Sequence, residues 1–281
     1  MTRHAAIIGH PVSHSRSPLI HGYWLKAHGI DGSYGRRDVE PAAIDAFLGD
    51  FTSSGLVGAN VTVPHKEAAF RACDELDPVA SALGAVNTIW LDGGRLCGAN
   101  TDVHGFLANL DAVEPDWTRA LGEAVVLGAG GAARAVIYGL LSRGIDRVVV
   151  ANRTLSRAEA LRDQFGPRVL PVDWRDMAGR LPGCRLLVNT TSLGMKGQPP
   201  LDIELSTLSP DALVTDIVYV PLVTPLLAAA KARGLATVDG LGMLLHQAVP
   251  GFERWFGVRP QVTGELRDLV LADLAAAGQL T

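Results

Sequence analysis

The sequence predicts an α/β fold of two domains, each built on a sheet that helices cover. Short apolar runs alternate with helix-like segments along most of the chain, as in proteins made of strand–helix units. The 281 residues are enough for two modest domains. A composition of 48% hydrophobic and 19% charged residues is typical of a well-packed globular protein and not of a disordered one.

The N-terminal part is expected to form the smaller α/β domain, with a parallel or mixed sheet. Its first helix is signalled by Ser17, interpreted as an N-cap, and by Pro18, which suits the first helical position. In this part we expect strands at 5–8, 57–63 and 85–90, and helices at 18–27, from about 41, from about 65 and at 102–110.

A second unit begins near Glu123. Residues 124–127 are wholly apolar, as expected for a strand buried on both faces of a parallel sheet. Further strands are expected at 148–150, 168–172, 185–189 and 213–218, with helices between them, and two last helices at 243–256 and 264–277. We expect these last helices to pack back on the first domain, so the chain divides into 1–103 plus 242–281 and 104–241.

Charge and composition argue against several classes of partner. The formal net charge is −4 and no basic run is present, so nucleic acid is not expected. No apolar segment approaches the roughly 20 residues that span a bilayer, so no membrane association is expected. Cys73, Cys97 and Cys184 are too scattered for disulfides or a thiolate site, and no histidine has metal-ligand spacing, so no metal is expected. Buried thiols in a reducing cytosol, and hence a cytoplasmic location, are expected.

A glycine-rich turn follows the strand at 124–127 and opens the next helix. It satisfies G-x-G-x-x-A, and its members are Gly128, Ala129, Gly130, Gly131, Ala132 and Ala133. Such a turn lets the backbone approach a pyrophosphate, whose charge meets N–H groups at the helix N-terminus. The sequence therefore predicts a Rossmann-type, doubly wound dinucleotide-binding domain. The alternative is a tight strand-to-helix turn without a ligand.

The end of the following strand indicates which dinucleotide is bound. Asn152 stands near the position where a carboxylate would hold the ribose 2′-hydroxyl of NAD, and Arg153, Thr154 and Arg157 follow it. A carboxylate would repel a 2′-phosphate, whereas arginine pairs with phosphate and can stack on adenine. NADP is therefore the expected cofactor. Otherwise, both arginines belong to a solvated helix face.

The loop before the first helix carries hydroxyl groups. Ser15 and Ser17 lie beside the helix start, where their hydroxyls would suit a carboxylate ligand. For Ser17, a simple N-cap is an equally good interpretation.

Residues 58–66 combine an apolar strand with a loop of polar side chains. Asn60, Thr62 and Lys66 supply an amide, a hydroxyl and an amine, which together can read substrate hydroxyls and move a proton. Each alone has an ordinary explanation, turn chemistry for the first two and a surface position for Lys66. The same applies to three further candidates, namely a turn or edge residue at Asn87, a helix cap at Asp102 and an exposed side chain at Gln247.

Taken together, these motifs resemble the shikimate dehydrogenase family nearly from end to end. The similarity is carried, in chain order, by Ser13-His-Ser-Arg-Ser-Pro18, Asn60-Val-Thr-Val-Pro-His-Lys66, Gly84-Ala-Val-Asn-Thr88, Asn100-Thr-Asp102 with Gly105, the glycine turn, Asn152-Arg-Thr-x-x-Arg157, Asn189-Thr-Thr-Ser-Leu-Gly-Met195, Asp216-Ile-Val-Tyr219-x-Pro221, Thr224-Pro-Leu-Leu227 and Gly240-x-x-Met-Leu-x-x-Gln247. One departure is Ile20-His-Gly22, where the family often has asparagine in the third place.

The resemblance implies NADPH-dependent, reversible reduction of 3-dehydroshikimate to shikimate in aromatic amino-acid biosynthesis. It implies that 1–103 plus 242–281 form a substrate-binding and catalytic domain, and that 104–241 bind NADP. It also implies site residues: Ser15, Ser17 and Tyr219 on the substrate carboxylate; Asn60, Thr62, Asn87 and Gln247 on the ring hydroxyls; Thr190, Ser192, Met195, Ile217, Gly240 and Met243 beside the cofactor. The partner is then a small molecule, and the enzyme is a monomer or a homodimer.

The residue types fit this chemistry. Hydride delivery to a ketone carbon produces an alkoxide, which is far more basic than an ammonium group. Lys66 can therefore stabilise that oxygen and protonate it, acting as general acid in reduction and general base in oxidation. Asp102 is expected to orient Lys66 and to accept a substrate hydroxyl, and the division of proton transfer between the two stays open.

Three other functions fit parts of the pattern. An NAD-dependent quinate/shikimate dehydrogenase of a catabolic route is the nearest alternative, and Arg153 argues against it. A non-catalytic NADP-binding module would lack the proton-transfer residues, yet Lys66 and Asp102 are present. A related enzyme acting on a folate derivative should lack the serine loop and Tyr219-x-Pro221, and both are present.

Overall fold

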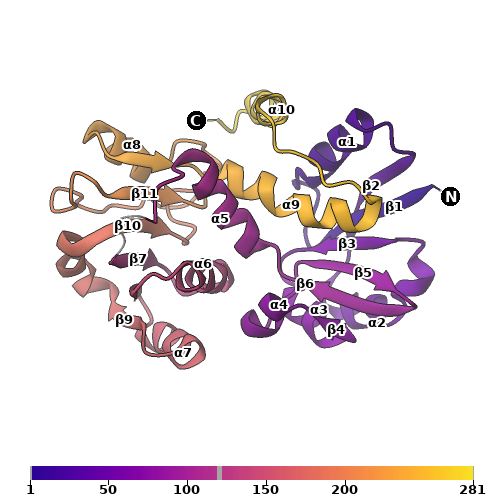
Figure 1. The fold of residues 1–281 in the computed structure, drawn as a ribbon, viewed down its shortest axis with the longest axis horizontal. Coiled ribbons are helices and arrows are strands. Elements are labelled where there is room, and N and C mark those ends of the chain that lie inside the picture. Colours follow the sequence, from indigo (N-terminus) through magenta and orange to yellow (C-terminus); the bar gives the residue numbers. More distant parts are fainter. Residues whose placement is uncertain (1, 119–121, 281) are drawn as a thin grey trace. The chain divides into compact units, whose positions relative to one another are not determined.

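The computed structural model describes residues 2–118 and 122–280, which form two compact units (Figure 1). Unit 1 contains the chain up to Asp102 together with Leu245–Val270. Unit 2 contains Val103–Leu244 and the residues from Leu271 onward. The predicted α/β class with two sheets is confirmed.

The unit bounds differ from the expected division at the C-terminus, where all residues from 242 onward were assigned to the first domain. In the structure the residues after Val270 group with unit 2. Hydrogen bonds within unit 2 account for this, because Leu222 N donates to Leu280 O at 3.3 Å and the Lys196 ammonium donates to Gly278 O.

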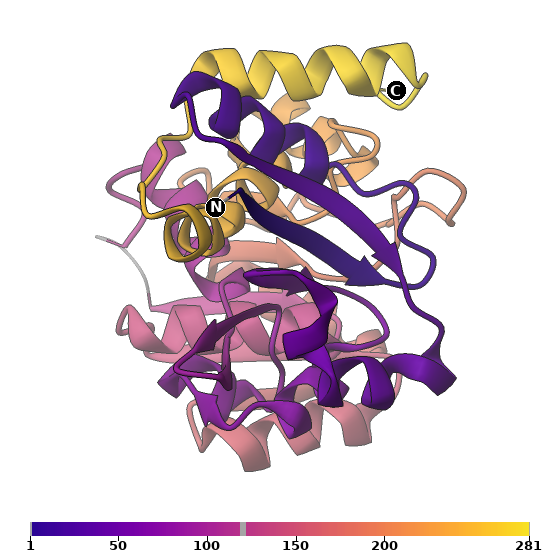
Figure 2. The same ribbon diagram turned by 90° about the vertical axis from the view of Figure 1, so that its right-hand side faces the viewer.

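The described strands of unit 1 form one mixed sheet in the order β2-β1-β3-β5-β6-β4. The bounds are β1 Arg3–Gly9, β2 Gly32–Asp38, β3 Gly58–Val61, β4 Glu75–Leu76, β5 Thr88–Asp92 and β6 Arg95–Ala99. Strand β1 pairs in parallel with β2 and β3, and β5 is antiparallel to β3 and β6. Figure 2 shows β1 and β2 side by side. The polar residues that follow β1 and β3 therefore come from the same end of the sheet.

Four helices belong wholly to unit 1: α1 Ser17–Ala27, α2 Ile44–Gly49, α3 Lys66–Ala72 and α4 Pro78–Leu83. Short 3₁₀ turns at Pro41–Ala43 and Phe51–Ser54 flank α2. Helix α4 begins with Pro78, and the Asp77 carboxylate accepts a hydrogen bond from the Ala80 N–H, which satisfies one of the amides left unpaired at a helix start. The predicted cap at Ser17 is wrong: Arg16 precedes α1, and no side chain caps it.

One face of the unit 1 sheet packs on helices α2, α3 and α4 through an aliphatic core that includes Ile8, Val61 and Ile89. The other face carries an aromatic cluster of Trp24, Tyr34, Phe252 and Trp255, with His21 among them. Phe252 and Trp255 come from α9 Leu241–Phe256. A helix near the C-terminus therefore covers part of one face of the N-terminal sheet.

Gly58 allows this helix to approach the sheet. A Cβ at this position would lie 2.1 Å from Nε1 of Trp255 and 2.4 Å from the carbonyl oxygen of Ile89. The same indole N–H donates to Ile89 O at 2.9 Å. Any side chain at residue 58 would therefore displace Trp255 from both its packing position and its hydrogen bond.

The sheet of unit 2 is parallel throughout its described strands, in the order β12-β11-β10-β7-β8-β9. The bounds are β7 Glu123–Leu127, β8 Arg147–Asn152, β9 Val169–Asp173, β10 Cys184–Asn189, β11 Leu213–Asp216 and β12 Ala236–Val238. Counted from β7, this is the strand order of the doubly wound Rossmann fold, whose ligands bind beyond the carboxyl ends of the strands.

Helices cover both faces of this sheet. They are α5 Asp102–Val113, α6 Gly131–Ser142, α7 Leu155–Phe165 and α8 Pro225–Ala232, with a 3₁₀ segment at Trp174–Gly183; α9 and α10 Gly264–Ala276 extend across the unit bounds. Along β7, Val126 faces the core under α5, α6 and α7, whereas Val125 and Leu127 face the core under α8. Burial on both faces explains why this strand is apolar at every interior position.

Several elements are not predicted by the sequence patterns, namely β2, β4, β6, α4, α8 and β12. Strand β3 is shorter than the expected 57–63, because backbone pairing with β1 ends at Val61 and a turn follows. Within the described residues, no helix is long and apolar enough to cross a membrane.

His21 is wholly buried in the aromatic cluster, with its ring stacked on Tyr34 at 4.0 Å between centroids. Burial lowers the pKa of His21 from 6.5 to about 3. The folded protein therefore keeps this ring neutral at a pH where the unfolded chain protonates it, so its contribution to stability is lost as the pH falls below 6.5.

We expect this group to lower the free energy of unfolding by about 1.6 kcal/mol between pH 6.5 and pH 5, because the slope approaches its limit of roughly 1.4 kcal/mol per pH unit only below pH 6. The variant His21→Leu, of similar volume, should lack this share of the acid sensitivity. Urea unfolding of both proteins at the two pH values measures it. Equal pH dependence in the two proteins would contradict the assignment.

Candidate active site

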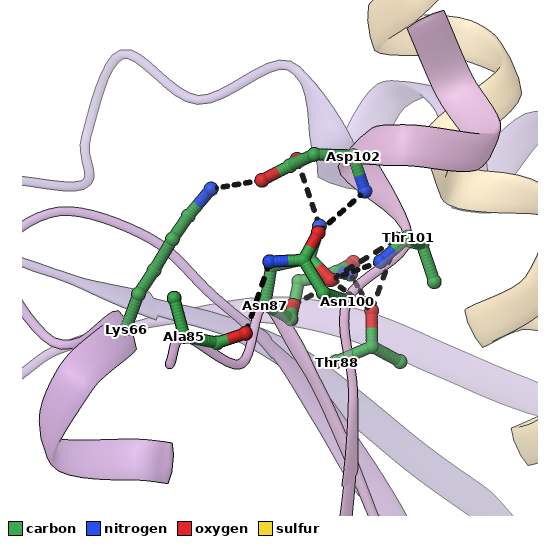
Figure 3. Close-up of polar contacts among 8 residues, drawn as sticks. Lys66, Ala85, Asn87, Thr88, Asn100, Thr101 and Asp102 are labelled. Carbon is green, nitrogen blue, oxygen red and sulfur yellow. Dashed lines mark hydrogen bonds and ion pairs between the residues drawn. The ribbon is translucent and has the colours of Figure 1, made fainter. Parts of the chain in front are cut away.

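Lys66 and Asp102 are brought together although 36 positions separate them in the chain. Lys66 is the first residue of α3, after the turn that ends β3, and Asp102 is the first residue of α5. The Lys66 Nζ lies 2.5 Å from Asp102 Oδ2 (Figure 3). The two side chains are 30% and 17% exposed, so a ligand can reach a pair that is partly shielded from water. The alternatives of a surface lysine and a plain helix cap do not describe this geometry.

Asn87 joins this pair through its amide group. Its Nδ2 donates to Asp102 Oδ1 at 2.8 Å, and its Oδ1 accepts the backbone N–H of Thr101 at 2.8 Å and the Thr101 hydroxyl at 3.1 Å (Figure 3). A backbone N–H can only donate, so the amide oxygen must face Thr101 and the amide nitrogen must face Asp102. Asp102 therefore accepts hydrogen bonds at both oxygens, one from Asn87 and one from Lys66.

Asn100 holds the backbone of the same segment. Its Oδ1 accepts the Asp102 N–H at 3.1 Å, and its Nδ2 donates to Ala85 O at 3.0 Å (Figure 3). The turn before α5 is thereby fixed to the turn before β5. This fixes the spacing of Asp102 and Asn87, which lie on these two segments.

Asn60, at the end of β3, lies in a buried part of the same network. Its Nδ2 donates to Asn87 O at 3.3 Å and to Thr88 Oγ1 at 3.2 Å, and the Tyr34 hydroxyl donates to its Oδ1 at 2.6 Å. Asn60 is only 4% exposed. Most of its hydrogen-bonding capacity is therefore used within the protein.

The serine loop is held by two residues at the end of β2. Arg36 donates to Ser15 O at 2.6 Å, and the Asp38 carboxylate accepts from Val12 N at 3.4 Å. The Ser15 hydroxyl lies 3.3 Å from that of Ser17, which is 3% exposed. The two hydroxyls thus lie side by side, as a carboxylate-binding pair requires.

The remaining candidates of unit 1 are Thr62 and Gln247. Thr62 is half-buried beyond β3, and its N–H pairs with Ile8 O at 2.9 Å. Gln247 is half-buried on α9, within the part of that helix that belongs to unit 1. Tyr219 belongs to unit 2, as do all the cofactor-binding candidates.

The glycine turn of unit 2 connects β7 to α6. Gly128 has φ of +99°, and a Cβ there would lie 2.9 Å from Thr191 Cγ2 and 3.0 Å from Thr190 Oγ1. Only glycine fits both the conformation and the space. Gly130 precedes α6, Gly130 and Gly131 are exposed, and no side chain caps this helix start. The backbone here is thus accessible for a phosphate group to approach, which fits a dinucleotide.

The arginines after β8 lie on the surface. Arg153, Thr154 and Arg157 are exposed, and the Asn152 amide donates to Thr154 O at 2.8 Å, which shapes the turn into α7. Two guanidinium groups near the end of the second strand suit an additional phosphate better than a ribose hydroxyl.

Asp216 connects the loops that follow β10 and β11. Its Oδ1 accepts from Asn189 Nδ2 and from Val218 N, both at 3.0 Å, and its Oδ2 accepts the Thr224 hydroxyl at 2.8 Å. Asn189 Oδ1 in turn accepts the N–H and hydroxyl of Thr191, at 3.0 and 2.8 Å. These bonds fix both loops and the start of α8 relative to one another.

The other cofactor-side candidates lie on these loops or beside them. Thr190, Ser192 and Met195 follow β10, Ile217 and Tyr219 follow β11, and Gly240 and Met243 lie at the start of α9. Met195 is 40% exposed. A Cβ on Gly240 would lie 2.3 Å from Ile217 O, so this position also requires glycine. The Asp216 network thus supports most of the candidates on this side.

Sequence reasoning assigned no role to Tyr34, Thr88, Thr101 or Asp216. Thr88, Thr101 and Asp216 belong to motifs that carry the family resemblance, and each is a polar residue at a strand end or within two residues of one. Tyr34 stands between glycines and charged residues and gave no signal. In the part of the chain that the structure describes, no group of three His, Cys, Asp or Glu residues could hold a metal.

The doubly wound sheet with its glycine turn, together with the lysine–carboxylate pair of unit 1, defines a two-unit oxidoreductase of the nicotinamide-nucleotide class. Three family descriptions match the sequence: "Shikimate dehydrogenase substrate binding domain" over 7–89, "Shikimate / quinate 5-dehydrogenase" over 118–194 and "Shikimate 5'-dehydrogenase C-terminal domain" over 240–264. The chain belongs to the shikimate dehydrogenase family.

Individual relatives agree with this assignment. A protein of Azorhizobium caulinodans named shikimate dehydrogenase (NADP(+)) is 64% identical over 278 residues, covering 99% of each chain. The solved shikimate 5-dehydrogenase of Thermus thermophilus, in complex with NADP(H) and shikimate, is 38% identical with a TM-score of 0.86, over 96% of this chain and 100% of that one. Quinate dehydrogenase from Corynebacterium glutamicum, in complex with NAD, is 34% identical with a TM-score of 0.89, over 96% and 99%.

The buried position of Asp216 has a measurable effect. Burial raises the pKa of Asp216 from 3.8 to about 6. The folded state therefore holds this proton more tightly than the unfolded state, and stability falls as the pH rises from about 4 to about 6. The variant Asp216→Asn cannot ionise, and its amide can donate to the Thr224 hydroxyl in place of Oδ2.

We expect the stability of Asp216→Asn relative to the wild type to increase by about 2.4 kcal/mol between pH 4 and pH 7.5. Urea midpoints of both proteins at the two pH values, converted with a common m-value, measure the difference. A difference that stays constant with pH would show that Asp216 does not titrate in this way.

Proposed function

We propose that this protein catalyses the reversible, NADPH-dependent reduction of 3-dehydroshikimate to shikimate, the shikimate-pathway reaction of aromatic amino-acid biosynthesis. The observation that carries the proposal is the Lys66–Asp102 pair, with Nζ 2.5 Å from Oδ2 and Asn87 on the second carboxylate oxygen. A charged amine held by an acceptor is the group needed where a ketone oxygen gains negative charge and a proton.

Within this proposal the substrate is bound by hydroxyl and amide groups. Ser15, Ser17 and Tyr219 bind its carboxylate, as the adjacent hydroxyls of the serine loop support. Its ring hydroxyls are bound by Asn60, Thr62, Asn87 and Gln247. Residues 1–103 plus 242–281 act as the substrate-binding and catalytic domain.

NADP binds the domain formed by residues 104–241, where its nicotinamide supplies the hydride. The glycine turn from Gly128 to Ala132 holds the pyrophosphate, as the space around Gly128 and the uncapped start of α6 support. Asn152, Arg153, Thr154 and Arg157 bind the adenosine end, with the exposed arginines on the 2′-phosphate. Thr190, Ser192, Met195, Ile217, Gly240 and Met243 border the nicotinamide.

Lys66 carries the transferred proton. Its ammonium group protonates the developing alkoxide during reduction, and its neutral amine removes the hydroxyl proton during oxidation. Asp102 orients the amine and accepts a hydrogen bond from a substrate hydroxyl. Each oxygen of Asp102 receives one N–H group, from Lys66 or Asn87, which leaves a second lone pair on each oxygen for a substrate hydroxyl.

We also propose that the enzyme acts in the cytoplasm, as a monomer or homodimer, without metal, membrane or nucleic acid. A cytoplasmic location agrees with a biosynthetic reaction that uses NADPH and with three free cysteines.

Initial rates of NADP⁺ and NAD⁺ reduction, each with shikimate and with quinate, test the function. We expect strong activity with shikimate and NADP⁺ only, because the arginines after β8 favour a 2′-phosphate. Better rates with quinate and NAD⁺ would instead assign a catabolic quinate dehydrogenase, the activity named for the Corynebacterium relative. Inactivity with all four pairs would leave a nucleotide-binding module.

Replacing Lys66 tests the proton transfer. We expect Lys66→Ala to lower kcat by about 10²- to 10⁴-fold with a much smaller change in the KM for shikimate, because the lost group acts on charge that develops only in the transition state. Lys26→Ala, which removes an exposed lysine of α1, is the matched control and should behave as the wild type. An unchanged kcat in Lys66→Ala would refute the assignment.

A further inference from the structure

Tyr34 is a buried side chain of β2 that has no assigned role. Its hydroxyl donates to Asn60 Oδ1 at 2.6 Å and also hydrogen-bonds with the Ser17 hydroxyl. Its ring stacks on the buried His21, with 4.0 Å between centroids and 8° between planes. Tyr34 therefore connects two residues that the proposed function places on the substrate.

The direction of the bond between Tyr34 and Asn60 is fixed by a neighbouring backbone group. Asn60 Nδ2 faces the carbonyl oxygen of Asn87 at 3.3 Å, and a carbonyl can only accept. The amide nitrogen of Asn60 must therefore be on that side, and its oxygen must face Tyr34. Burial raises the pKa of the Tyr34 hydroxyl, which keeps its proton and can donate it. Since that proton goes to Asn60, the Ser17 hydroxyl must be the donor toward Tyr34.

The chain of donors continues to the proton-transfer pair. Asn60 Nδ2 also donates to Thr88 Oγ1 at 3.2 Å, which leaves the Thr88 hydroxyl proton for Asn87 Oδ1 at 3.1 Å. The backbone N–H of Thr101 independently requires that oxygen to be an acceptor. Asn87 Nδ2 then donates to Asp102, which accepts Lys66 on its other oxygen. Every bond from Ser17 to Asp102 thus runs in one direction.

We propose that Tyr34 and Thr88 are positioning residues that connect the carboxylate-binding end of the substrate site with the Lys66–Asp102 pair. Tyr34 fixes Ser17 and Asn60, and Thr88 fixes the amides of Asn60 and Asn87. This inference rests on the proposed function and specifies how its substrate contacts are oriented. Neither residue acts on the substrate directly.

The chain of donors also restricts what each amide can offer a ligand. Both N–H groups of Asn60 are used, by Asn87 O and Thr88, so Asn60 can only accept from a substrate hydroxyl. Asn87 is the opposite: its oxygen is occupied by Thr101 and Thr88, and one N–H remains after the bond to Asp102. A hydroxyl that meets both residues must therefore donate to Asn60 and accept from Asn87.

The variant Tyr34→Phe removes the hydroxyl and keeps the ring on His21. We expect the KM for shikimate to rise about tenfold while the KM for NADP⁺ stays within about twofold, because only the substrate-side groups lose a buried partner. The matched control is Tyr23→Phe, whose hydroxyl donates to Glu265 at 3.1 Å in the same unit. A purely structural Tyr34 would lower the melting temperature and leave both KM values unchanged, and that result would overturn its role.

Thr88 tests the other end of the chain with a matched pair of variants. Thr88→Val keeps the shape of the side chain and removes the hydroxyl, so we expect kcat with shikimate to fall about tenfold. Thr88→Ser keeps the hydroxyl and should restore kcat to within about twofold of the wild type. Equal kcat values in the valine and serine variants would overturn the role of Thr88.

The wild-type protein in the same assay separates this inference from the proposed function. An active wild type together with unaltered Tyr34→Phe and Thr88→Val variants would overturn the positioning roles alone. An inactive wild type would overturn the proposed function, and this inference with it.

Discussion

Both candidate sites depend on one constraint, which is that a polar group buried at the end of a strand must have a hydrogen-bond partner. Leaving such a group unpaired costs about 1–3 kcal/mol, so each amide has one stable orientation. Asn87 illustrates this most clearly: the Thr101 N–H fixes its oxygen, and its nitrogen can then only face Asp102. The orientation of the carboxylate beside Lys66 is therefore set by a backbone group that no substitution removes, except one by proline.

The two units use the same arrangement with different results. In each, an asparagine oxygen accepts the N–H and hydroxyl of one threonine while its nitrogen donates to an aspartate: Asn87 with Asp102, and Asn189 with Asp216. Asp102 also has a lysine partner and is 17% exposed, as its proposed catalytic role requires. Asp216 is 1% exposed, and burial raises its pKa to about 6. The difference in charge partner and exposure thus distinguishes the proposed catalytic aspartate from the aspartate that supports loops.

Local sequence patterns predicted the elements whose stability comes from their own residues. The strand at 124–127 and the glycine turn after it are examples. Burial on both faces requires an uninterrupted apolar run, and the positive φ of the turn requires glycine, so both can be recognised in the sequence. Strand β2, Gly-Ser-Tyr-Gly-Arg-Arg-Asp, has no apolar alternation and forms through parallel pairing with β1, so its strand character and the role of Tyr34 could not be predicted. Lys66 and Asp102 were identified individually, but their approach to 2.5 Å depends on turns that Asn100 holds across distant segments.

The packing of Trp255 against Gly58 has a consequence for synthesis on the ribosome. Strands β1, β2 and β3 emerge long before α9, and residues 103–240 are translated between them. Domains generally fold in the order in which they emerge, yet here one face of the first sheet has only α1 as early cover and lacks Phe252 and Trp255 until the chain has almost been completed. The nascent N-terminal segment therefore has strands β1 to β6 present early, but it exposes part of an apolar sheet surface to the cell until α9 has been made.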